Sequence, residues 1–536
     1  MAFHKMPPVN MIRQMLMYRE WVPHRVRFWL FIFFALIYQL VGGVYLASMT
    51  QMVGDLAFLS EDVTMAGYCT LIGLTIIFPM LFRIKFRFFT RQLFFITGIG
   101  LILCNIVTMY VEIPWVIWIV CFFAGILKMA GMFGCMSSIQ LCITPTRNFG
   151  VFFPVVYILV CGAIQLSGMC TAYIAYFTNW RVMNLLLIVL LIIHMTIAFF
   201  FMKKDHRSGP YLPLKGVDFF GFALWSALMI VGTWIFTFGE HYDWWENQTI
   251  WIATLIFIIL LIACLAESKF KENPYIALKA FTYPRVISLM IILLGLSVLQ
   301  AAAHSLQPIY VNSVLQFDSL NVISLNYPEL LGVIFGALLA FYSIVKWKWS
   351  VKKYIFMAFA LIAYYEISMY FLIGYDTNKE AMYLPLFAFG MAEVMMETIA
   401  TYYLSQAIPF LHFFMTISII GFIRAGLGTA IGAAIVHRLF NWSMAKNFML
   451  SSSNIDGQAT IANVHNWADQ MNIISTQSLM ISIKECYGYL ILIAIIFMVI
   501  VLATNFKTSI TRMLPRLMSV RRWLNNNTTT SQDPTT

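Results

Sequence analysis

The sequence has little charge. Asp, Glu, Lys and Arg make up only 11% of its 536 residues, whereas 61% of the residues are hydrophobic. The mean hydropathy is +0.81. A soluble protein of this length could not remove so much apolar surface from water, because soluble chains carry about 25% charged residues. The composition therefore excludes an ordinary soluble protein and predicts a membrane protein.

Cysteine is also scarce and has no pattern. The nine cysteines are scattered, most of them inside apolar stretches, and no pair has CxxC spacing. This arrangement predicts neither a disulfide framework nor a metal site. We expect no cofactor. A membrane enzyme would need a catalytic His or Asp cluster at a membrane face, but the connections lack Asp-x-Asp and His206 has no partner motif. The protein is therefore not expected to be an enzyme.

The chain contains about fourteen apolar stretches near the roughly 20 residues that a helix needs to cross ~30 Å of hydrocarbon. The predicted spans are 28–50, 63–82, 92–110, 114–139, 150–178, 181–202, 217–239, 250–267, 286–307, 325–347, 354–374, 381–405, 410–438 and 486–504. The sequence therefore predicts an all-α, multi-pass membrane protein.

Positive charges give the orientation of these spans. Of the 34 Lys and Arg residues, 27 fall in the N-terminal segment, the even-numbered connections or the C-terminal tail, and five fall in the odd-numbered connections. Because Lys and Arg are retained on the cytoplasmic side, both termini are predicted to be cytoplasmic. The net charge of +11 is then explained by short loops facing anionic lipid headgroups of the bilayer. No nucleic-acid partner is expected.

The middle of the chain carries motif residues in a fixed order. They are Asp218, Gly221, Gly239, Glu240, Trp244, Glu267, Asn273, Pro274, Tyr275, Ile276, Leu278 and Phe281. Asn179-Trp180-Arg181 precedes this run, and Gln307-Pro308-Ile309-Tyr310 follows it. Their order and spacing resemble the major facilitator superfamily, specifically its fourteen-span drug:proton antiporter branch (the EmrB/QacA type). The resemblance covers nearly the whole chain in span order.

This resemblance implies a 6+2+6 arrangement of helices. It implies a cytoplasmic N-terminus (1–27), a six-helix half (28–202), two inserted helices (217–267), a cytoplasmic linker (268–285), a second six-helix half (286–504) and a cytoplasmic tail (505–536). The second half includes a polar outer loop at 439–485, and the tail ends in a polar segment expected to be disordered. By the same resemblance, spans 1, 4, 9 and 12 line a central cavity.

The sequence also departs from the family. Val41 occupies the place of an Asp in span 1, and Cys121 that of an Arg in span 4. The loop after span 2 keeps only its basic character, with structural or gating candidates at Arg83, Arg87 and Arg91. The fold assignment survives these departures, but the coupling machinery of the family is not transferred to this chain.

Charged groups inside spans are costly and usually face protein or water. Glu393 and Glu397 are four residues apart and share one face of span 12. Two carboxylates that close do not both ionise easily, so one is expected to hold a proton and to act as the coupling group. A purely structural pair is the alternative. Lys128, in span 4, is the predicted cavity partner of this pair; a local packing role is its alternative.

Further polar candidates lie in three other spans. Gln300, His304 and Gln307 form a polar stripe in span 9, and His304 is a second proton-coupling candidate. Arg424, in a glycine-rich helix, and Glu366, in span 11, are predicted to be structural or gating residues.

The sequence thus predicts a secondary active transporter working by alternating access. The resemblance implies export of amphipathic drugs or other small molecules in exchange for protons, across a cell inner membrane. A periplasmic adaptor and an outer-membrane channel are hypothetical partners. Two alternatives remain: a transporter of a specific metabolite, lipid or siderophore on the same fold, and a non-transporting membrane sensor.

Overall fold

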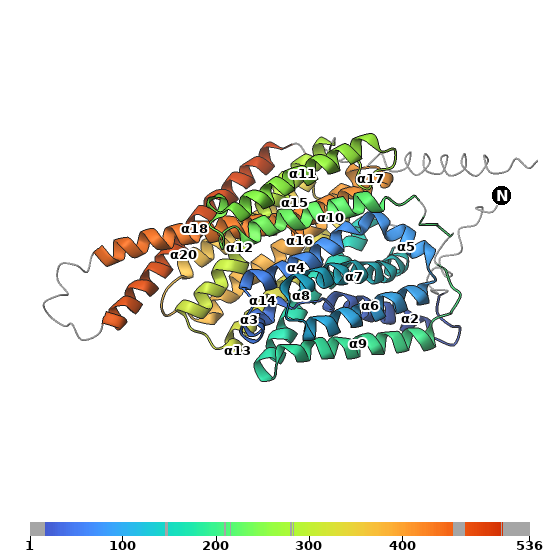
Figure 1. Cartoon of the computed structure of the whole chain (residues 1–536), viewed down its shortest axis with the longest axis horizontal. Helices are drawn as coiled ribbons and strands as arrows, with labels where there is room; N and C mark the ends of the chain where they lie inside the picture. Colours follow the sequence, from blue (N-terminus) through green and yellow to red (C-terminus); the bar gives the residue numbers. More distant parts are fainter. Residues whose placement is uncertain are drawn as a thin grey trace, which may run out of the picture.

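The computed structural model describes residues 17–144, 148–207, 211–214, 216–278, 281, 283–453, 467–504 and 506. This part of the chain is a bundle of long helices (Figure 1). Thirteen helical segments in it are long and apolar enough to cross a membrane. A single β-bridge, between Tyr18 and Met202, ties the N-terminal segment to the end of a helix.

In the described residues, the first half of the bundle contains eight helices. They are α2 (His24–Leu40), α3 (Met49–Leu56), α4 (Ser60–Ile76), α5 (Leu81–Arg87), α6 (Thr90–Tyr110), α7 (Pro114–Ile143), α8 (Phe149–Phe177) and α9 (Trp180–Phe201). The remaining helices are α10 (Phe219–Phe238), α11 (Gln248–Phe270), α12 (Pro284–Ile309), α13 (Ser319–Ser324), α14 (Asn326–Phe341), α15 (Val351–Leu372), α16 (Tyr383–Ala407), α17 (Phe410–Ala425), α18 (Leu427–Ser453) and α20 (Trp467–Ala503). Each of the fourteen predicted spans overlaps at least one of these helices.

The first predicted span is interrupted. Helix α2 ends at Leu40, the chain from Val41 to Tyr45 is not helical, and a short 3-10 turn then leads into α3. The Tyr45 hydroxyl accepts a hydrogen bond from the Gly42 N–H at 3.0 Å and donates one to Asn105 at 3.0 Å, which satisfies part of the open backbone. The prediction of a continuous helix over 28–50 is therefore wrong.

Span 13 is also interrupted, at Gly426, and it is much longer than predicted. Helix α18 continues to Ser453, and α20 begins at Trp467, so 439–453 and 467–485 are helical rather than a loop. The rest of the predicted outer loop, 454–466, lies outside the described residues, as does the tail except Phe506. In Figure 1 the two helices extend beyond the bundle at the left, which we call the hairpin end. The opposite end, near α5, carries Arg87 and Lys203 and is called the basic end.

Several helix crossings in the described part of the chain are close enough to require glycine, and two of them correspond in the two parts of the chain. A Cβ at Gly125 of α7 would lie 2.0 Å from the Thr70 carbonyl oxygen of α4, and a Cβ at Gly390 of α16 would lie 2.3 Å from that of Glu329 on α14. Such contacts leave no room for a side chain, so the backbones touch directly. The α4–α7 and α14–α16 pairs thus have the same kind of crossing in the two parts of the chain, a structural repeat that the sequence does not display.

Helices from the two parts of the chain meet at two places. Helix α8 packs against α14 and α16, and α4 packs against α17. Near the basic end, Phe414 of α17 contacts Phe82 at a ring-centroid distance of 4.7 Å and Phe133 at 6.1 Å. Helices α10 and α11 pack on each other, with α10 against α4 and α18. The polar site described next lies where α8 meets α14 and α16, a contact that we call the seam.

Candidate functional site

An ion pair between two helices forms the centre of the site. Glu397 of α16 pairs with Arg424, in the last turn of α17. Glu397 is buried, with only 7% of its surface exposed. Arg424 reaches this carboxylate because α17 ends at Gly426, where the chain turns before α18 begins. A buried charge pair of this kind is maintained only when further hydrogen bonds complete it.

Tyr157 of α8 completes the network from across the seam. Its hydroxyl accepts a hydrogen bond from Arg424 at 3.3 Å and shares a second one with Thr401 of α16. The Thr401 hydroxyl also donates to the carbonyl of Glu397 at 2.9 Å, one helical turn earlier. One tyrosine of the first half of the chain is therefore bonded to both helices that form the ion pair.

A second link crosses the same seam about two helical turns further along α8. The Gln165 amide of α8 donates a hydrogen bond of 2.5 Å to Glu329 of α14, which is 8% exposed. Glu329 lies at the Gly390 crossing, and Glu393 follows one helical turn after that glycine. The charges of Glu329 and Glu393 are close enough to interact. Helices α8, α14, α16 and α17 therefore bring three carboxylates to one region.

This arrangement can take up and release protons. Arg424 neutralises Glu397, whereas Glu393 and Glu329 have no cationic partner within ion-pair distance among the described residues. Carboxylates that share a poorly solvated region repel each other when both are charged, so protonation relieves that repulsion. The predicted proximity of Glu393 and Glu397 is confirmed as geometry; their role in coupling stays a prediction.

Lys128 does not join this cluster, so its predicted partnership with the carboxylates is wrong in this structure. Its ammonium group donates a hydrogen bond of 2.8 Å to the carbonyl of Gln39, in the last turn of α2. The interruption of span 1 creates this acceptor, because the last carbonyls of a helix have no partner within the helix and carry partial negative charge. Lys128 therefore caps a broken helix, and Arg424 is the residue that pairs with the carboxylates.

The polar stripe of α12 is present but lies apart from the ion pair. His304 is exposed, although Ala302 and Ala303 beside it are buried, and its ring lies 6.0 Å from that of Phe389 on α16. Gln307 accepts a hydrogen bond of 3.0 Å from Tyr365, and Gln300 is half-buried. His304 thus lies beside the site helix α16 and stays the second coupling candidate.

The other charged candidates have separate surroundings. Glu366 is completely buried, and neither carboxylate oxygen has a hydrogen-bond partner among the described residues. At the basic end, Arg87 stacks on Tyr211 at 4.7 Å and Arg91 on Phe199 at 4.4 Å. Arg83 lies on α5 near Gly216. These arginines contact the surface of the bundle rather than the site.

The motif residues of the middle region hold the turns of α10 and α11. Asp218 accepts a hydrogen bond of 2.9 Å from the Gly221 N–H, which caps α10, and pairs with Lys271 at 2.5 Å. Burial alone would raise the pKa of Asp218, but its polar neighbours Glu267, Gly221 and Lys271 outweigh this effect and lower the pKa to about 2. At the hairpin end, the Trp180 indole donates to Asp55 at 2.9 Å. These family-like residues are therefore structural here.

Several site residues are not recognisable from the sequence. Tyr157, Gln165 and Thr401 are ordinary polar residues of membrane helices, and only their position opposite a charge distinguishes them. Glu329 lies near the start of the predicted span 325–347 but is buried, and the helical segment that carries it already begins at Ser319. The polar residues of α8 at positions 157 and 165, two turns apart on one face, are an available signal.

Solved membrane transporters have the same architecture. The peptide transporter POT in complex with alafosfalin is 13% identical, with a TM-score of 0.59 over 92% of this chain and 98% of that chain. A bacterial homologue of the human drug peptide transporters PepT1 and PepT2 is 12% identical, with a TM-score of 0.56 over 93% of this chain and 100% of that chain. The nucleoside transporter NupG is 11% identical, with a TM-score of 0.51 over 89% of this chain and 98% of that chain. This chain has the major facilitator fold.

These structural similarities concern the fold alone. No protein-family model matches the sequence, and no curated protein matches it. Identities of 11–13% leave side chains at the site free to differ. No group of three or more His, Cys, Asp or Glu residues in the described part of the chain could hold a metal ion. On this major facilitator fold, the function must be argued from the Glu–Arg–Tyr network itself.

Proposed function

We propose that this protein is a proton-coupled secondary transporter of small molecules. The observation that carries the proposal is the network of Glu397, Arg424 and Tyr157, which links one helix of the first half of the chain to two helices of the second half. In a major facilitator fold, transport requires these two halves to move against each other. A titratable ion pair that bridges them can make that movement depend on a proton.

The coupling step follows from charge balance. When Glu397 takes up a proton, the attraction between Glu397 and Arg424 weakens, because a neutral carboxyl group no longer pairs with the guanidinium. A negative charge on Glu393, one helical turn away on the same face, favours this proton uptake. Arg424 then loses the partner that positions it against Tyr157, and the link between α8 and α17 weakens. Loss of the proton restores the pair. Protonation thus selects between two arrangements of the same helices.

The moving bodies proposed here are residues 28–202 and 286–504, with α10 and α11 (217–267) as an added pair and 268–285 as the connection. The excess of basic residues supports an inner-membrane protein with both termini and the basic end in the cytoplasm. The EmrB/QacA resemblance of the middle region supports export of amphipathic compounds. An adaptor and an outer-membrane channel rest on that resemblance alone.

A transporter of a specific metabolite is the second candidate. It is favoured by the loss of charge at Val41 and Cys121, which are both buried. A Cβ at Gly43 would lie 2.5 Å from the Cys121 sulfur, so the non-helical segment after α2 packs on α7 without the charged pair that the drug antiporters would place there. Peptides and nucleosides, the substrates named for the structural neighbours, belong in any substrate panel.

Purified protein in liposomes with an imposed pH gradient tests the proposal. A panel of lipophilic dyes, dipeptides and nucleosides is followed with and without the gradient. We expect gradient-driven flux of at least one compound, severe loss of it in Glu393→Gln and Glu397→Gln, and a smaller effect on exchange without a gradient. Glu366→Gln, a buried carboxyl outside the network, is the matched control. Normal gradient-driven flux in both site variants would move the coupling role to His304.

A further inference from the structure

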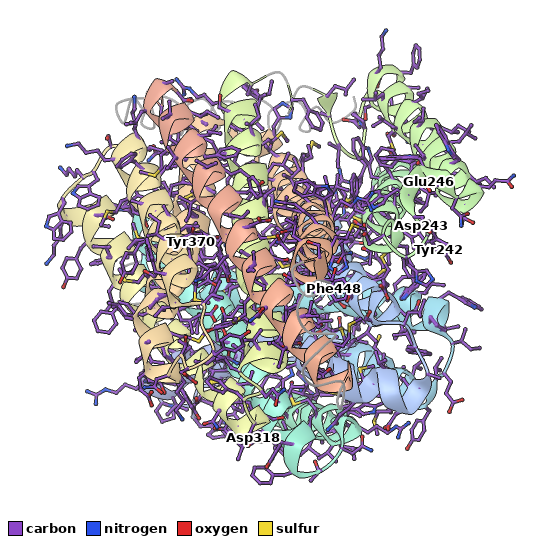
Figure 2. All side chains as sticks on the ribbon, turned by 90° about the vertical axis from the view of Figure 1, so that its left-hand side faces the viewer. Tyr242, Asp243, Glu246, Asp318, Tyr370 and Phe448 are labelled. Atoms are coloured by element: carbon purple, nitrogen blue, oxygen red, sulfur yellow. The ribbon has the colours of Figure 1, made fainter. Side chains whose placement is uncertain are left out.

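A groove of about 1010 Å³ lies at the hairpin end, outside the Glu–Arg–Tyr site. It is formed by the end of α10, the turn before α11, and the facing sides of α18 and α20. Figure 2 views this end and shows that Tyr242, Asp243 and Glu246 of the turn lie together beside these helices. Pockets of about 300–1,000 Å³ hold ligands the size of a drug molecule. The groove is therefore large enough for a substantial part of an amphipathic molecule.

The walls of the groove are apolar and accessible from outside the bundle. They are formed mainly by Phe236, Trp245, Ile435, Trp442, Tyr489 and Leu492. Trp245, Ile435 and Leu492 are 49%, 46% and 57% exposed, so their side chains are accessible rather than packed. Tryptophan and tyrosine concentrate where the hydrocarbon meets the headgroups. These walls fit an acyl chain that enters from the membrane.

The rim of the groove carries charges of both signs. Arg438 is 65% exposed and lies 3.4 Å from Glu240. Glu240 also accepts hydrogen bonds from Asn441 at 2.9 Å and from the Trp244 indole at 2.7 Å, so Arg438 shares its partner and keeps free donors. The side chains of Asp243 and Glu246 have no hydrogen-bond or ion-pair partner in the described residues. The rim thus offers one guanidinium and two unpaired carboxylates.

The backbone of the turn is held in a strained shape that presents these groups. Asp243 and Trp244 have φ values of 53° and 55°. The left-handed region is unfavourable for residues with bulky side chains, and strain of this kind persists only where the surroundings enforce it. Here the Trp244 N–H bonds to the Gly239 carbonyl at 2.7 Å, and its indole bonds to Glu240. The turn therefore keeps the two carboxylates and Trp245 on the groove side.

We propose that this groove binds one phospholipid with a zwitterionic headgroup from the leaflet at the hairpin end. The acyl chain lies along the apolar walls, the phosphate receives hydrogen bonds from Arg438, and the ammonium group lies between Asp243, Glu246 and the face of Trp245. A guanidinium suits a phosphate, and carboxylates with an aromatic face suit an ammonium. An anionic lipid without an amine would leave both carboxylates facing its negative charge.

The test uses the full-length protein in nanodiscs that contain equal amounts of phosphatidylethanolamine and phosphatidylglycerol. Native mass spectrometry after mild delipidation counts the lipids retained per protein. We expect one phosphatidylethanolamine in the unaltered protein. Arg438→Gln, which removes the phosphate donor, and Ile435→Trp, which fills the groove, should each lower its retention about tenfold.

Two matched variants control for general effects on lipid binding. Lys379→Gln removes a cation that lies outside the groove, where it bonds to Asn321, and Ile192→Trp enlarges a 50% exposed residue of α9. Both should retain the lipid. The proposal is overturned if no lipid is retained, if phosphatidylglycerol is retained equally, or if the two groove variants behave like the controls. Binding is read without any transport assay, so failure of the proposed coupling would leave this result intact.

Discussion

Arg424 and Glu397 form an ion pair between α17 and α16, and the same guanidinium bonds to Tyr157 of α8. This relationship joins the two parts of the chain by one charged group. Arg424 lies in the last turn of α17, directly before the break at Gly426. The guanidinium therefore holds three helices together at one point.

Replacing Glu397 and replacing Arg424 should reduce the stability of the protein by different amounts. Glu397→Gln leaves a guanidinium that keeps its charge, whereas Arg424→Met leaves a carboxylate that can become neutral by binding a proton. We expect Glu397→Gln to cost about 3–5 kcal/mol of stability, and Arg424→Met to cost less. Thermal unfolding in detergent measures both. The double variant should recover part of the loss, and a lower midpoint for Arg424→Met than for Glu397→Gln would contradict this reasoning.

The close contact between Gly390 of α16 and Glu329 of α14 should not tolerate even a methyl group at position 390. Gly390→Ala places a Cβ 2.3 Å from the Glu329 carbonyl oxygen, so α14 and α16 must separate. We expect a loss of about 1–3 kcal/mol, seen as a lower thermal midpoint and a lower yield of folded protein. Gly168→Ala on α8 is the control, because no atom lies within 4 Å of the position that its methyl group would take. Equal midpoints for the two variants would count against the close crossing.

Lys128 should act on the stability of α2 rather than on proton coupling. Lys128→Ala removes the donor to the Gln39 carbonyl at the broken helix end. Hydrogen bonds between membrane helices contribute about 0.6 kcal/mol on average, and the helix-end charge adds to this, so we expect a loss of about 1–2 kcal/mol. The pH optimum of transport should stay unchanged. A shifted optimum would instead place Lys128 in the coupling machinery.

Asp218 should stabilise the protein only above acidic pH. Its pKa is lowered from 3.8 to about 2, so its contribution is complete above pH ~4 and disappears as the pH falls through about 2. A shift of this size corresponds to about 2 kcal/mol. Thermal unfolding of the unaltered protein and of Asp218→Asn should differ at pH 5 and converge toward pH 2. A difference that grows on acidification would reverse the predicted sign.

Thiol labelling should place the hairpin end and the basic end on opposite sides of the membrane. In a background without accessible native thiols, Ser453→Cys lies at the end of α18 and Lys204→Cys follows α9. An impermeant reagent added outside intact cells should label position 453 and spare position 204 until the membrane is permeabilised. The reverse pattern would invert the proposed orientation. The C-terminal tail beyond Phe506 lies outside the described residues, so position 204 reports on the basic end in its place.

The sequence by itself determined the class of the protein, the order of its helices and the candidates at Glu393 and Glu397. Apolar length and the distribution of Lys and Arg are properties of the chain that hold in any arrangement of the helices. A carboxylate spacing of four residues likewise needs only one helix. These features are local, so they could be recognised without knowing which helices touch.

Only the tertiary structure decided which charges meet. Lys128 and Arg424 are both cations inside spans, and nothing local distinguishes the one that pairs with Glu397. The breaks at Val41–Tyr45 and Gly426 made the difference, because one exposes helix carbonyls to Lys128 and the other places Arg424 against α16. Tyr157 and Gln165 acquire their roles only by facing α16, α17 and α14 across the seam. Pairing between residues hundreds of positions apart depends on how helices pack, and that information is absent from any single helix.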